Sequence, residues 1–228
     1  MMLKKIRKGL EPHKPKINTK IQKRASVLIP LIEIEGELFV FFTERAKHLR
    51  SHPGQVSFPG GKQDTQDANS LETALREARE EIGLPPEKVE IIGTLDQILS
   101  LHYYLVTPFV AFIPDDFVPI PNTGEIEAVF KVPLTFFMNG DNHWTEEFKT
   151  QHATVLAHHF DFQGYDIWGL TAKLILRLLE IGLGHLPDFP VHHPDSPTWI
   201  ERTLDFSGEE LPFDSEAFSH LEQRKVHR

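Results

Sequence analysis

The sequence lacks cysteine altogether, which excludes disulfides and thiolate-bound metal sites. It also lacks any apolar run near the roughly 18 residues that a membrane-spanning helix requires, so we expect no membrane span. The N-terminus has no continuous apolar segment followed by a small-residue cleavage site, and the C-terminus matches no address signal. From these absences we expect a cytoplasmic location.

Charge is unevenly distributed along the chain. Residues 1–24 hold nine Lys or Arg and one acid, which leaves 15 bases and 32 acids, a formal charge of −17, for the rest. The acidic character of residues 25–228 argues against nucleic acid as a partner. We interpret residues 1–24 as an irregular, solvated basic arm that could touch phosphates, residues 25–182 as the folded domain, and residues 183–228 as a loosely packed extension.

Hydrophobic periodicity predicts strands interleaved with two helices, an α/β or α+β fold. A long polar loop is expected over 44–61, and long loops inside compact domains are often functional. In the clearest helix, Ser70 can cap the start and Gly83 the end. Strands are expected at 26–33, 37–43, 89–95, 104–113, 127–132 and 154–162, with a turn at Glu35-Gly36, and helices at 71–82 and 167–181.

One face of the 71–82 helix carries three glutamates. Glu77, Glu80 and Glu81 stand at i, i+3 and i+4, so they occupy one narrow sector. Like charges at this spacing destabilise an isolated helix, which suggests a cation between or above them. Hard carboxylate oxygens suit Mg²⁺ or Mn²⁺. The glutamates alone also fit an ordinary solvated helix face.

The turn upstream of this helix favours the metal site. Phe58-Pro59-Gly60-Gly61 ends a strand-like segment and places glycines where backbone must approach another group closely. Such a turn can set the carbonyl of Gly60 beside a metal held by the helix. Its exposed amides, including that of Gly61, can meet phosphate oxygens.

At these residues the chain resembles the Nudix family. Residues 76–84 read Arg-Glu-Ala-Arg-Glu-Glu-Ile-Gly-Leu, which matches the ending of the Nudix box at every defined position. Two departures lie earlier: Asp67 stands where the box has Glu, and the interval from it to Arg76 is one residue longer. The resemblance implies an α/β/α sandwich with a mixed β-sheet and a metal-dependent pyrophosphohydrolase.

The segment before the box resembles the coenzyme A pyrophosphatase branch of that family. Residues 42–61 read Phe-Thr-Glu-Arg-Ala-Lys-His-Leu-Arg-Ser-His-Pro-Gly-Gln-Val-Ser-Phe-Pro-Gly-Gly, and the extra residue after Asp67 is also similar to this branch. The branch implies hydrolysis of coenzyme A or acyl-CoA to 3′,5′-ADP and 4′-phosphopantetheine. Arg45 and Arg50 are candidate phosphate ligands, because guanidinium groups bind phosphate bidentately, and Gly60 and Gly61 would complete the substrate site.

The resemblance also implies roles for the helix residues. Glu77 and Glu81 would be the principal metal ligands, Glu80 the next, and the Gly60 carbonyl a backbone ligand. Arg76 would orient the glutamates through an ion pair.

The residue that accepts the proton of the attacking water is either Glu80 or Glu125. Glu125 could equally form a structural ion pair. Other readings are a Nudix hydrolase for ADP-ribose or a dinucleotide, a Nudix ligand sensor without hydrolysis, and a structural protein with an acidic helix. A homodimer is also open.

Overall fold

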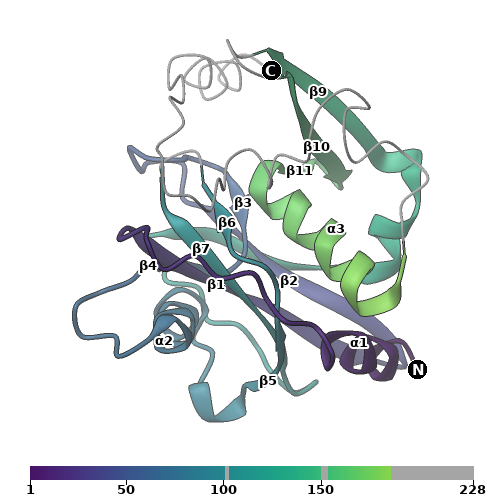
Figure 1. The fold of residues 1–228 in the computed structure, drawn as a ribbon, viewed down its shortest axis with the longest axis horizontal. Helices are drawn as coiled ribbons and strands as arrows, with labels where there is room; N and C mark the ends of the chain where they lie inside the picture. Colours follow the sequence, from purple (N-terminus) through teal and green to yellow (C-terminus); the bar gives the residue numbers. More distant parts are fainter. Residues whose placement is uncertain (101–102, 150–153, 186–228) are drawn as a thin grey trace.

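A mixed sheet forms the centre of the computed structural model, which describes residues 1–100, 103–149 and 154–185 (Figure 1). Its strand β1 runs antiparallel to β2 and parallel to β7. A second, smaller sheet has the order β11-β10-β9. The strands of the large sheet are β1 (Arg24–Ile34), β2 (Glu37–Arg45), β3 (Val56–Ser57), β4 (Gly60–Lys62), β5 (Glu90–Thr94), β6 (Ile98–Leu99), β7 (Leu105–Phe112) and β8 (Ile126–Pro133), and those of the small sheet are β9 (His143–Lys149), β10 (Thr154–Phe162) and β11 (Tyr165–Trp168).

Helices cover both faces of the large sheet, which confirms the predicted α/β/α sandwich (Figure 1). One face carries α2, and the other carries α1 and α3. Along β1, Leu28 and Ile32 pack against the α2 side, while Ile29 and Leu31 join the core on the opposite side. A central strand buried on both faces explains its long apolar run. The helices are α1 (Met2–Leu10), α2 (Ser70–Ile82) and α3 (Gly169–Leu183), with short 3₁₀ turns η1 (Pro86–Lys88), η2 (Leu134–Met138) and η3 (Gly140–Asn142).

The prediction of an irregular arm at residues 1–24 is wrong for residues 2–10, whereas residues 11–23 carry no helix or strand. Met2–Leu10 forms α1, whose Ile6 and Leu10 are 0% and 4% exposed. The helix packs against α3 so closely that a Cβ added at Gly9 would lie 2.4 Å from the carbonyl oxygen of Gly182. The i, i+4 spacing of Ile6 and Leu10 is a helical signal that the surrounding basic residues obscure.

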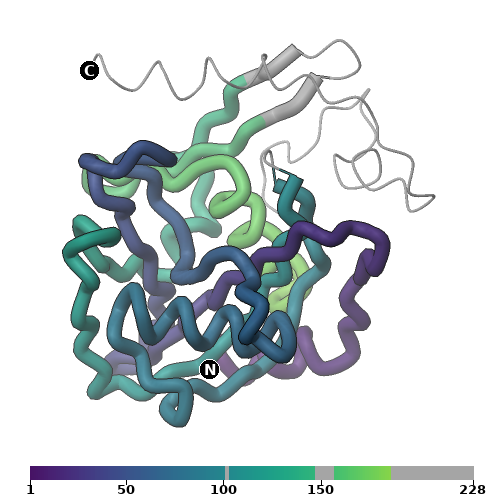
Figure 2. Tube along the Cα trace, turned by 90° about the vertical axis from the view of Figure 1, so that its left-hand side faces the viewer, coloured from purple at the N-terminus to yellow at the C-terminus, as the bar shows by residue number. Residues whose placement is uncertain are grey.

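The segment after α1 is also bound to the body. The Lys16 N–H donates to Asp96 at 2.8 Å, and the Gln97 N–H donates to the Lys16 carbonyl at 3.1 Å. The buried Asn18 donates its N–H to the side-chain oxygen of Gln97 at 2.8 Å. Figure 2 traces this purple chain from α1 back along the fold to β1. The first 24 residues therefore belong to the folded body.

Ile6→Ala should lower the free energy of unfolding by about 2–4 kcal/mol, because it leaves a cavity between α1 and the core. Urea denaturation followed by circular dichroism measures the change, with Lys4→Ala on the exposed face of α1 as the control. An unfolding midpoint equal to that of Lys4→Ala would show that α1 is not docked.

Smaller differences from the expected elements have local causes. Asn69, rather than Ser70, caps α2, because its side-chain oxygen accepts from the N–H groups of Leu71 and Glu72 at 2.9 and 3.0 Å. Gly83 ends the helix in the left-handed region, as expected. The loop expected at 44–61 contains β3 and the first two residues of β4. The helix expected at 167–181 begins only at Gly169, because residues 167 and 168 end β11. Strand β9 was not expected. Of the predicted extension 183–228, residues 186–228 lie outside the described part of the chain.

Candidate metal and diphosphate site

The Gly60-Gly61 turn lies directly against α2. A Cβ added at Gly61 would lie 2.5 Å from the Glu77 Oε1 atom, and one added at Gly60 would lie 2.3 Å from the backbone carbonyl of Ser26. The Gly60 N–H donates to the Glu81 Oε2 atom at 3.1 Å. Glycine at position 61 therefore lets the backbone approach Glu77 this closely, and glycine at position 60 lets it approach β1.

Two of the carboxylates are withdrawn from water. Glu81 is 7% exposed, and burial raises its pKa to about 8, although the hydrogen bond from Gly60 acts in the opposite direction. Burial also raises the pKa of Glu77, with the Arg76 guanidinium opposing the shift. The negative charge of Glu125 raises the pKa of both. Burial and neighbouring negative charge both disfavour the ionised forms of Glu77 and Glu81, so a cation held between these two carboxylates would stabilise them.

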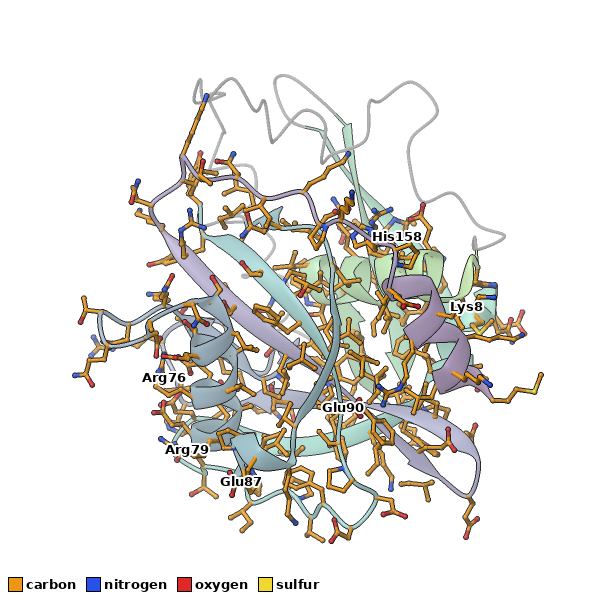
Figure 3. The ribbon with its side chains drawn as sticks, turned by 60° about the horizontal axis from the view of Figure 1, so that its bottom comes forward. Lys8, Arg76, Arg79, Glu87, Glu90 and His158 are labelled. Carbon is orange, nitrogen blue, oxygen red and sulfur yellow. The ribbon has the colours of Figure 1, made fainter. Side chains whose placement is uncertain are left out.

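Arg76 connects this cluster to the loop before the helix. Its guanidinium donates to both Asp67 oxygens at 2.9 Å each, to Glu77 at 3.0 Å and to Glu80 at 3.0 Å. A further bond of 3.2 Å reaches the Lys62 carbonyl. In Figure 3, Arg76 lies on the side of the molecule away from Lys8 on α1.

Asp67 therefore has a defined contact. Its side chain is 4% exposed, and the hydrogen bonds from Arg76 hold its pKa well below the usual range. The same contact raises the pKa of Arg76. The loop with the extra residue thus fixes the guanidinium that contacts Glu77 and Glu80. The sequence left the role of Asp67 open because it did not give the loop conformation.

Asp67→Asn should reduce kcat/KM by about tenfold, because Arg76 loses its bidentate partner and no longer holds Glu77. It should also lower the free energy of unfolding by about 1–3 kcal/mol. Since the folded-state pKa of Asp67 lies below the ordinary 3.8, this stability difference is present above that pH and shrinks as the pH falls below it. Denaturation at a series of pH values measures it; a difference that grows toward acid would contradict the assignment.

Arg45 and Glu125 approach the same cluster from the strand side. The Arg45 Nη1 atom is 4.0 Å from the Glu125 Oε2 atom, and its Nε–H donates to the Ser51 carbonyl at 2.9 Å. The charge of Arg45 lowers the pKa of Glu81, although burial of Glu81 dominates. Arg50 is exposed, and within the described part of the chain it makes no hydrogen bond or ion pair with these residues.

The donor atoms suit a hard divalent cation. Among the described residues, no three His, Asp or Glu side chains converge into a complete metal cage. Mg²⁺ does not require one, because it is commonly held by one or two carboxylates and completes its shell with water and substrate phosphates. The buried Glu81 carboxylate accepts one hydrogen bond among the described residues, from the Gly60 N–H, which leaves oxygen lone pairs for a cation. Glu77 and Glu81 therefore fit Mg²⁺ or Mn²⁺, and the sequence contains no cysteine thiolate that would favour a softer metal.

Comparison with known proteins identifies the family. A model described as NUDIX domain matches residues 22–152, more than half of the chain. The chain belongs to the Nudix hydrolase family. Among solved structures it is similar to a MutT/nudix family protein from Enterococcus faecalis, with 12% identity, a TM-score of 0.45, and coverage of 75% of this chain and 64% of the other.

Three relatives show where this Nudix chain lies within the family. It is 42% identical to Nudix hydrolase 15, mitochondrial, of Arabidopsis thaliana, covering 73% of this chain and 61% of the relative. It is 39% identical to the uncharacterized Nudix hydrolase NudL of Escherichia coli, covering 75% and 90%. It is 37% identical to the peroxisomal coenzyme A diphosphatase NUDT7 of Mus musculus, covering 73% of each. The chain spans about three fifths of the length of the two plant relatives that it matches, 61% and 60%.

Within its described residues, no helix has the length and apolar character needed to cross a bilayer.

Proposed function

We propose that this chain is a metal-dependent diphosphatase that hydrolyses coenzyme A, or an acyl-CoA, to 3′,5′-ADP and 4′-phosphopantetheine. The observation that carries the proposal is the buried Glu81 carboxylate bound to the Gly60 amide, at the end of the loop that follows Arg45 of β2. The sequence of that loop and the name of the mouse relative support coenzyme A over other diphosphates.

The chain's own residues supply distinct parts of the reaction. When bound, a divalent cation would neutralise developing charge on phosphate and acidify a water molecule. Glu77 and Glu81 would hold it, with Glu80 and the Gly60 carbonyl as further oxygen donors. Arg76 keeps Glu77 and Glu80 in place through bonds of 3.0 Å each.

For the proton of the attacking water, Glu125 is the better of the two candidates. Glu80 is bound to Arg76 at 3.0 Å, whereas Glu125 is 52% exposed and its closest ion-pair contact, to Arg45, is 4.0 Å long. A side chain so loosely held can turn toward the water, and its charge already acts on Glu77 and Glu81.

The phosphate groups would be held by Arg45, the last residue of β2, and by the loop that follows it. Arg45 is tethered to the Ser51 carbonyl at 2.9 Å, which positions its Nη atoms toward the carboxylate cluster. Arg50 is exposed and could reach a second phosphate, such as the 3′-phosphate of coenzyme A. The amides of the Gly60-Gly61 turn would complete the cradle.

A substrate panel tests the proposal. Coenzyme A, an acyl-CoA, ADP-ribose and a dinucleotide are each incubated with Mg²⁺ or Mn²⁺, and the products are identified by mass spectrometry. We expect 3′,5′-ADP and 4′-phosphopantetheine from coenzyme A, at higher kcat/KM than any product from ADP-ribose. A higher kcat/KM for ADP-ribose or a dinucleotide would show that coenzyme A is not the preferred substrate. Binding of coenzyme A without hydrolysis would favour a ligand sensor.

Location and partners remain predictions. The names of the relatives place them in the mitochondrion, chloroplast or peroxisome, whereas we propose the cytoplasm for this chain. Subcellular fractionation decides between these compartments. We expect no nucleic-acid binding, and light scattering of the purified chain will show whether it forms a homodimer.

A further inference from the structure

Ser26 lies on β1 directly beside the Gly60-Gly61 turn. In the β1–β4 pairing it stands opposite Gly61, and residues opposite each other in an antiparallel pair point to the same face of the sheet. A Cβ added at Gly61 would lie 2.5 Å from the Glu77 Oε1 atom, so this face looks toward α2. Leu28, two residues further along β1, packs against the same side. The Ser26 side chain therefore points from β1 toward the carboxylate cluster.

The Ser26 hydroxyl is buried without a hydrogen bond. The residue is 0% exposed, and its Oγ atom has no partner among the residues that the structure describes. Thr107, which pairs with Ser26 on β7, has a hydroxyl that accepts from the Gln97 side chain at 2.9 Å. A hydroxyl buried without a partner lowers the stability of a folded protein, and such groups are rare. Ser26 therefore calls for a role other than packing.

The Glu77 carboxylate is within reach of this hydroxyl. Opposite Cβ positions in an antiparallel pair are roughly 5 Å apart, so the Ser26 Cβ lies about that far from the point at Gly61 that would touch Glu77. The Glu77 Oε1 atom accepts from Arg76 at 3.0 Å, and its side chain is 18% exposed. A small rotation of the Glu77 side chain would bring the carboxylate to the hydroxyl. A carboxylate can accept from both groups and still bind a cation, because it has about four lone-pair sites.

We propose that Ser26 is a positioning residue of the metal site, and that its hydroxyl donates a hydrogen bond to the Glu77 carboxylate when Glu77 binds the cation. Glu77 would then be restrained from two sides, by Arg76 on α2 and by Ser26 on β1. Hydrogen bonds of this kind orient the groups that bind a metal and strengthen its binding. The proposal rests on the metal site of the proposed function, but not on which diphosphate is cleaved.

Ser26→Ala separates this role from a structural one. In EDTA, removal of a buried hydroxyl that has no partner should raise the thermal midpoint by about 2–4 °C. The affinity for Mn²⁺, followed by electron paramagnetic resonance, should fall about tenfold, because Glu77 loses a hydrogen bond that orients it.

Thr171→Val is the matched control. Thr171 is also buried, but it lies on α3 across the sheet, and its hydroxyl donates to the Val56 carbonyl at 3.1 Å. Its loss should lower the thermal midpoint by about 2–4 °C and leave the Mn²⁺ affinity unchanged. Equal Mn²⁺ affinity in Ser26→Ala and the wild type, or a lower midpoint of Ser26→Ala in EDTA, would overturn the proposal.

A double-mutant cycle tests whether Ser26 acts through Glu77. In a Glu77→Gln background, Ser26→Ala should change the Mn²⁺ affinity less than about twofold, whereas in a Glu80→Gln background its full effect should persist. An effect that persists in the Glu77→Gln background would overturn the proposal. Absence of Mn²⁺ binding by the wild type would overturn the metal site and this proposal together. Cleavage of ADP-ribose in place of coenzyme A would overturn only the proposed substrate, and the cycle would still decide the role of Ser26.

Discussion

Glu81→Gln is expected to lower turnover by about a thousandfold or more with the fold intact. Loss of one metal-binding carboxylate removes several kcal/mol of transition-state stabilisation, and each 1.36 kcal/mol corresponds to about tenfold in rate. Glutamine has nearly the same shape and can still accept from the Gly60 N–H, so the turn should keep its position. Steady-state kinetics of coenzyme A hydrolysis measures the effect, and activity within tenfold of the wild type would remove Glu81 from the metal site.

The same substitution should make the metal-free protein more stable at alkaline pH. The folded-state pKa of Glu81 is raised to about 8 from an ordinary 4.5, so the folded chain holds this proton more tightly than the unfolded chain. Wild-type stability is therefore lost as the pH rises from 4.5 through 8, and glutamine removes that loss.

Urea denaturation in EDTA should show Glu81→Gln more stable by on the order of 1–3 kcal/mol at about pH 9, with no difference near pH 4. A variant that is less stable than the wild type at alkaline pH would show that the folded protein already compensates the buried charge.

Gly61→Ala should abolish most activity without a comparable loss of stability. The added Cβ would lie 2.5 Å from the Glu77 carboxylate, which is the mobile end of a long side chain and can move aside. The fold is then preserved, but Glu77 leaves the cation site. We expect kcat/KM to fall at least about a hundredfold, while the unfolding free energy changes by less than about 1 kcal/mol.

Gly36→Ala is the control for this substitution, because it should give the opposite pattern. No atom lies within 4 Å of the added Cβ, but the residue has a φ of +82° in the β1–β2 turn. Stability should fall by about 1 kcal/mol with activity unchanged. If Gly61→Ala instead loses stability as Gly36→Ala does and keeps its activity, the close approach of turn and helix is wrong.

The reaction class could be predicted because its residues are local in sequence. Glu77, Glu80 and Glu81 lie within five positions of one helix, so the 3.6-residue period alone brings them to one face. The predicted strands over 26–33 and 37–43 are confirmed for the same reason, since a glycine turn joins neighbours. The sequence predicted that Arg76 orients the glutamates but did not show that Asp67 holds Arg76 in place, because this contact depends on the conformation of the loop before the helix.

Long-range packing explains what the sequence did not give. Docking of α1 depends on Gly182, more than 170 residues from Gly9, and local composition points instead to a charged arm.

Mn²⁺ binding, followed by electron paramagnetic resonance, tests most directly whether the α2 carboxylates hold a metal. The wild type should bind Mn²⁺ without substrate, and Mg²⁺ should displace it. The double variant Glu77→Gln/Glu81→Gln should bind at least about a hundredfold more weakly, because both oxygen donors lose their charge. Glu87→Gln, at an exposed position after the same helix, should bind as the wild type does. Equal Mn²⁺ affinity in the double variant and the wild type would contradict the assignment of this site.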